Sequence, residues 1–146
     1  MNNTAIASIG AGYSLSEPAS LINKPSMLFL AGDEDFNYIE VLNSDKLLSH
    51  SGIFYYAYTF HGKHEWPDNE IIREIIQWFE FDAYRRNKKL VNKKIVRDYI
   101  SFIQQKIKFF QDQGNYTEAY SACERGIQFL SGIASTVKLQ KNGKHL

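Results

Sequence analysis

Two loops of this chain concentrate side chains that are suited to acid–base chemistry. The first loop holds three consecutive acids directly after an apolar run, and the second holds two histidines. The acids are Asp33, Glu34 and Asp35, and the histidines are His61 and His64. A carboxylate that accepts a hydrogen bond from one imidazole nitrogen orients the ring and leaves the other nitrogen to act as a general base. These residue types therefore predict a carboxylate–imidazole pair that activates a nucleophile.

Each of these loops follows a segment with strand character. Residues 27–31 are uninterrupted apolar sequence, which favours a strand covered on both faces of a parallel sheet. Residues 53–60 are rich in β-formers, and residues 4–9 form a shorter apolar run. Helical patterns over 36–48 and 69–81 alternate with these strands, so we expect an α/β fold with parallel pairing. Both loops then lie at the same edge of the sheet, where open α/β sheets hold their sites.

Three strands are few for a parallel sheet. Such sheets are normally larger and covered on both faces. We therefore expect much of the 27–31 run to be uncovered in this chain, as in a part of a larger sheet with an exposed edge that favours self-association.

The charge distribution predicts a domain boundary. The 146 residues carry a net charge of +1, but residues 1–81 hold four basic and eleven acidic residues, and the remainder is strongly basic. Seven basic residues fall within Arg85–Arg97, a composition that suits a solvated connector. We expect one domain over residues 1–84 and a second region over residues 85–146.

The second region has a helical pattern throughout. Apolar residues follow helical spacing over 95–110 and again over 116–130, with the breaking sequence 112–115 between them. Two helices joined by a short turn that contains glycine predict an α-helical hairpin. Residues 114–120 are similar to the turn and second helix of a tetratricopeptide repeat.

Composition excludes several classes of protein. Hydrophobic residues make up 44% of the chain and aromatic residues 14%, which is too apolar for a disordered protein. Cys123 is the only cysteine, so the chain forms no internal disulfide and no multi-cysteine zinc site. No run approaches the ~20 apolar residues of a membrane span, and Met1–Thr4 do not begin a signal peptide, so we expect a soluble protein. The basic run Arg85–Arg97 lacks aromatic residues for base stacking, so we expect no nucleic-acid binding.

Residues 31–38 and 60–67 resemble the C-terminal half of an α/β-hydrolase, closest to esterase-like and dienelactone-hydrolase-like members. The family's Gly-x-x-Asp turn matches residues 32–35, which implies that Asp35 is the triad acid. The family's Gly-x-His pattern implies that His64 is the triad histidine. Acid before histidine is also the family's chain order. The resemblance covers roughly residues 4–81 and implies neither a cofactor nor a metal.

The nucleophile of that family is missing from the chain. No Gly-x-Ser-x-Gly elbow occurs in the sequence. The resemblance therefore implies the C-terminal portion of a serine hydrolase for small carboxylic esters, supplying acid and histidine to a serine located elsewhere. The alternative function is non-catalytic, with a degenerate hydrolase fragment whose helical hairpin binds a protein partner.

The candidate site residues also have plain structural interpretations. The three acids are also typical of a solvated loop or of the cap of the next helix. His64 is also compatible with an ordinary loop histidine. His61 competes with His64 for the role of base. A metal site on residues 61–65 would need a helix to bring ligands three positions apart together, and Gly62 and Pro67 oppose a helix there.

Overall fold

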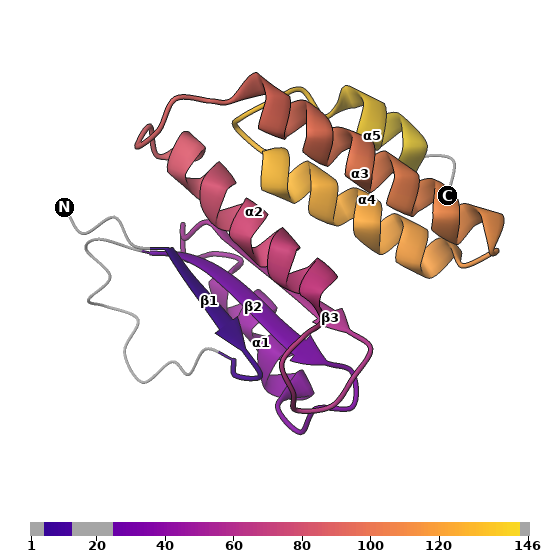
Figure 1. Ribbon diagram of the computed structural model, residues 1–146. Coiled ribbons are helices and arrows are strands. Elements are labelled where there is room, and N and C mark those ends of the chain that lie inside the picture. The colour runs from indigo at the N-terminus through magenta and orange to yellow at the C-terminus, as the bar shows by residue number, and fades with distance from the viewer. Residues whose placement is uncertain (1–4, 13–24, 144–146) are drawn as a thin grey trace. The chain divides into compact units, whose positions relative to one another are not determined.

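The computed structural model describes residues 5–12 and 25–143 (Figure 1). The chain divides into two compact units, Met1–Asp82 and Ala83–Leu146. Residues 1–4, on which the expectation about a signal peptide rests, lie outside the described residues. The elements in chain order are β1 (Ala5–Ile9), β2 (Ser26–Gly32), α1 (Tyr38–Leu48), β3 (Tyr55–Phe60), α2 (Asn69–Arg85), α3 (Lys93–Asp112), α4 (Tyr116–Leu130) and α5 (Val137–Gly143).

The first unit contains a three-stranded sheet in the order β1-β2-β3. Both neighbouring pairs are parallel, with Ile9 opposite Leu30 and Gly32 opposite Phe60. The predicted α/β class and the parallel pairing are confirmed. Because all three strands run the same way, the loops after β1, β2 and β3 leave the sheet at one edge.

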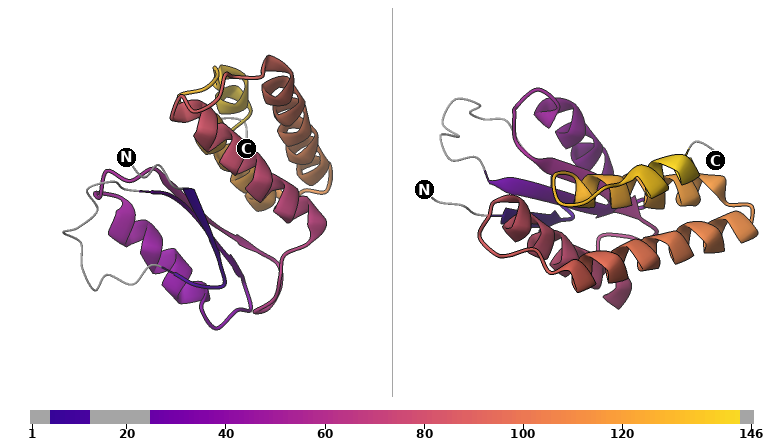
Figure 2. Two further views of the ribbon diagram at one scale, coloured as in Figure 1. Left: turned by 60° about the vertical axis from the view of Figure 1, so that its left-hand side comes forward. Right: turned by 90° about the horizontal axis from the view of Figure 1, so that it is seen from above.

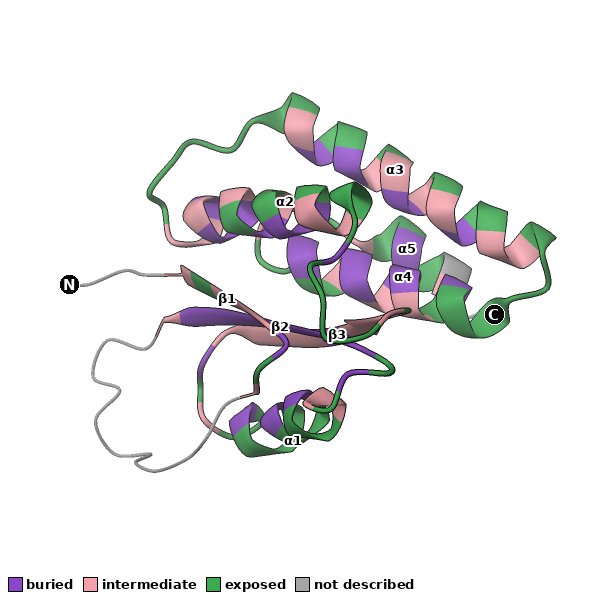
Figure 3. Ribbon diagram, turned by 60° about the horizontal axis from the view of Figure 1, so that its bottom comes forward, coloured by how far each residue is buried: buried purple, intermediate pink, exposed green. Residues whose placement is uncertain are grey.

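Strand β2 is buried along its whole length. On one face Phe29 packs in a core with Val41 and Leu48 of α1, and α2 lies on the opposite side of the sheet (Figure 3). The expectation that this apolar run would be left uncovered is therefore wrong. With a neighbouring strand on each side and a helix over each face, three strands are enough to enclose the central one. Exposure falls instead on the outer strands, as at Ile6 of β1, which is 41% exposed.

The second unit is helical. Helix α3 begins after Asn92, whose side chain accepts hydrogen bonds from the Lys94 and Ile95 amides. Helix α4 runs back along α3 (Figure 2). The Tyr99 and Phe129 rings stack between them with centroids 5.9 Å apart. Helix α5 packs on α4. In the described part of the chain, no helix combines the length and apolar character needed to cross a membrane.

The basic run is only partly a connector. Its first residue, Arg85, ends α2, and the guanidinium group donates to the carbonyls of Phe129 and Ser131 at 2.9 and 3.0 Å. Residues 86–92 form the loop, and the last basic residues of the run already belong to α3.

Candidate functional site

The loops that follow β2 and β3 are joined through their backbones. The Asp33 amide donates to the Phe60 carbonyl at 2.8 Å, and the Glu34 amide donates to the Gly62 carbonyl at 2.9 Å. Gly32 permits this approach, because a Cβ atom at that position would lie 2.1 Å from the Gly62 oxygen. Backbone hydrogen bonds alone therefore hold the acidic loop against the histidine loop.

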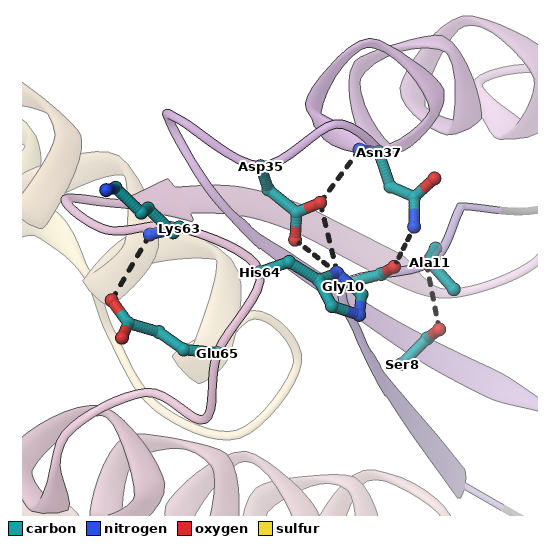
Figure 4. Close-up of polar contacts among 8 residues, drawn as sticks. All are labelled: Ser8, Gly10, Ala11, Asp35, Asn37, Lys63, His64 and Glu65. Atoms are coloured by element: carbon teal, nitrogen blue, oxygen red, sulfur yellow. Dashed lines mark hydrogen bonds and ion pairs between the residues drawn. The ribbon is translucent and has the colours of Figure 1, made fainter.

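Asp35 and His64 contact each other at this junction (Figure 4). The His64 Nδ1 atom lies 3.0 Å from Asp35 Oδ2 and 3.1 Å from Oδ1. The Asp35 side chain is 1% exposed, whereas the His64 side chain is 51% exposed. The contact that the sequence predicted between these two side chains is confirmed.

The carboxylate is held in place by its neighbours. The Asn37 backbone amide donates to Asp35 Oδ1 at 2.8 Å, which leaves the carboxylate with two hydrogen-bond donors. Because an ionised carboxylate only accepts hydrogen bonds, Nδ1 of His64 carries the proton in this arrangement. Nε2 is then the unprotonated nitrogen of the neutral ring, and it lies on the side of the ring away from Asp35 (Figure 4).

A hollow of about 220 Å³ lies beside the imidazole. Its lining comes from the end of β1 and from the loop after β3. The lining residues are Ile9, Gly10, His64, Glu65 and Trp66. Trp66 is 80% exposed, and the exposed Phe36 ring lies on His64 with centroids 4.5 Å apart. The imidazole therefore borders a small space with both apolar and polar walls.

A second carboxylate–imidazole pair lies in the same two loops. His61 Nδ1 is 3.1 Å from Asp33 Oδ2, and the Gly62 amide donates to Asp33 Oδ1 at 3.0 Å. The Gly62 hydrogen bond, followed by that of His61, lowers the pKa of Asp33, and the hydrogen bond to Asp33 raises the pKa of His61. Both side chains are solvent-exposed. His61 therefore pairs with Asp33 and does not compete for Asp35.

One group of side chains in the described residues has ligand atoms close enough to hold a metal ion. Atoms of Asp33, Glu34 and His61 lie within 4.8 Å of one another, and all three residues are exposed. This group differs from the metal site on residues 61–65 considered from the sequence, because His61 and His64 contact different acids. Residues 61–65 are a series of bends and form no helix.

Sequence reasoning missed two residues of the site. Asn37 contacts both the acid and the end of β1, and Gly10 lies against the imidazole. Only the position of Asn37, two residues after Asp35, hinted at its contact with the carboxylate. Comparisons with models of protein families, with curated proteins and with solved structures found no match to this chain.

Proposed function

We propose that this chain supplies the acid and the base of a serine hydrolase that acts on carboxylic esters. The observation that carries the proposal is the asymmetry of the Asp35–His64 pair. The acid is buried and held by a backbone amide, whereas the imidazole that it orients is half-exposed beside a hollow. That combination suits a general base, which must be fixed on one side and accessible on the other.

In this proposal Asp35 accepts from Nδ1–H and fixes the tautomer of His64. Nε2 then takes the hydroxyl proton of a serine as the serine oxygen bonds to the acyl carbon. The protonated ring, stabilised by Asp35, returns that proton to the departing alkoxide. The serine belongs to a segment outside these 146 residues, because the sequence has no nucleophile elbow.

Fluorophosphonate labelling of the protein purified from its natural source tests this function. We expect a labelled serine on a polypeptide continuous with this chain or bound to it. His64→Ala should abolish the label, whereas His50→Ala, which removes an exposed histidine in the turn after α1, should preserve it. A label that survives His64→Ala, or no labelled serine in the wild type, would contradict the proposal.

A second candidate function rests on the helical unit. A groove of about 550 Å³ lies on α4 and α5, and it includes the half-exposed Tyr120 and Val137. A protein-binding role for this unit without catalysis would fit such a surface. It predicts that Tyr120→Ser weakens partner capture while His64→Ala has no effect, the reverse of the result expected for a hydrolase.

A further inference from the structure

We propose that Gly10 and Asn37 are positioning residues that lock the Asp35–His64 pair to the end of β1. The proposal rests on the proposed function for its meaning in catalysis. The positioning itself is measurable without any activity. The proposal gives the end of β1 a role in the site, in addition to the ends of β2 and β3, which carry the acid and the histidine.

Gly10 is packed directly against both members of the pair. A Cβ atom built on this residue would lie 2.9 Å from His64 Cε1, 3.0 Å from His64 Nδ1 and 3.2 Å from Asp35 Oδ2. Its φ angle of +68° is also one that residues other than glycine rarely adopt. The imidazole therefore occupies the space that any other residue at position 10 would fill.

The backbone of Gly10 is anchored on both sides. Its amide donates to the Leu30 carbonyl of β2 at 2.7 Å. Its carbonyl accepts a short hydrogen bond from the Asn37 side-chain amide (Figure 4). The surface against which His64 rests is thus fixed both to the sheet and to Asn37.

Asn37 connects this surface to the acid. Its backbone amide donates to Asp35 Oδ1 at 2.8 Å while its side chain donates to Gly10. Asn37 is also the N-cap residue of α1, where asparagine commonly accepts from the first amides of a helix, yet its side chain makes no capping hydrogen bond. The side chain bonds across 27 positions of sequence to the end of β1 instead, and this favours a role in the site over a role in the helix.

The ring ¹⁵N shifts of His64, recorded on this chain at neutral pH, test the proposal because they report which nitrogen carries the proton. In the wild type we expect the Nδ1–H tautomer, with exposed His50 as an internal reference for an unconstrained ring. In Gly10→Ala we expect loss of that preference and shifts close to those of His50. Gly114→Ala is the matched control, since Gly114 has a similar φ of +71° but an added Cβ there meets no atom within 4 Å. The control should leave His64 unchanged.

Asn37→Ala carries the test if Gly10→Ala does not fold. Its matched control is Ser8→Ala, which removes the hydrogen bond from Ser8 Oγ to the Ala11 carbonyl in the same turn and does not touch the pair. We expect Asn37→Ala, and not Ser8→Ala, to shift His64 toward the His50 reference. Wild-type shifts in folded Gly10→Ala or Asn37→Ala, or equal changes in the controls, would overturn the proposal. A tautomer shift without ester hydrolysis in the natural protein would refute the hydrolase function and leave the positioning role intact.

Discussion

Asp33 and His61 form an exposed ion pair, with 3.1 Å between Asp33 Oδ2 and His61 Nδ1. The pair lies in the same two loops as the buried Asp35 carboxylate and its histidine. The two pairs have the same chemistry but differ in burial. His61 hydrogen-bonds to an exposed carboxylate, whereas His64 hydrogen-bonds to a buried one and is itself half-exposed.

Removing the exposed acid should change the titration of one histidine only. In Asp33→Asn we expect the pKa of His61 to fall toward its ordinary value of 6.5, because the hydrogen bond and the charge that raise it are weakened or lost. The stabilisation from the pair is complete between about pH 3.8 and 6.5, the ordinary values of the two groups. It is lost as the pH rises through the raised pKa of His61 or falls through the lowered pKa of Asp33. Since both groups are exposed, solvent screening keeps this contribution small.

An NMR titration of the His61 ring protons in the wild type and in Asp33→Asn measures that change. Asp35→Asn is the control and should leave the midpoint of His61 where it is. An unchanged midpoint in Asp33→Asn would show that the ion pair does not form in solution.

This chain alone should not turn over an ester by an acyl-enzyme route. Its His64 imidazole is oriented by Asp35, but the chain lacks the nucleophile elbow, so we expect neither saturation nor a burst with a short-chain aryl ester. Stopped-flow absorbance measures the burst. A burst that a serine-directed inhibitor titrates would mean that one of the chain's own serines is the nucleophile.

The fold of the helical unit should protect its single thiol. Burial is the main cause that raises the pKa of Cys123, and its Sγ atom donates to the Leu139 carbonyl at 3.0 Å. The reactive thiolate is therefore scarce and shielded, and we expect an aromatic disulfide reagent to modify the native protein far more slowly than the unfolded one. Equal rates with and without denaturant would contradict the packing of α5 on α4.

Trypsin should cut first in the loop between α2 and α3. Lys88 and Lys89 are exposed there and precede Leu90, which is 92% exposed, whereas the Arg85 guanidinium is bound to two carbonyls. Mass spectrometry of the earliest fragments identifies the site. The double variant Lys88→Gln, Lys89→Gln should remove these fragments, and early cleavage at Arg73 inside α2 would indicate that the helix opens before the loop is cut.

The strands and the main contact of the site could be predicted because they depend on local patterns and one topological rule. The apolar run before Gly32 and the Tyr-rich run before His61 specify parallel strands, and parallel strands bring Asp35 and His64 to one edge. The contact of Asn37 with Gly10 could not be predicted, since an asparagine before a helix normally caps it. The apolar run indicated a strand covered on both faces, but the expectation that three strands would leave it uncovered was wrong, because the burial of β2 depends on how closely α1 and α2 approach the sheet.

The measurement that tests the central claim most directly is kcat for a short-chain ester, in the protein purified from its natural source. Asp35→Asn should lower kcat by as much as ~10⁴-fold, because the amide favours the wrong tautomer of His64. Asp33→Asn should have a much smaller effect, because Asp33 contacts His61 and not His64. Equal losses in the two variants, or full activity in Asp35→Asn, would contradict the account.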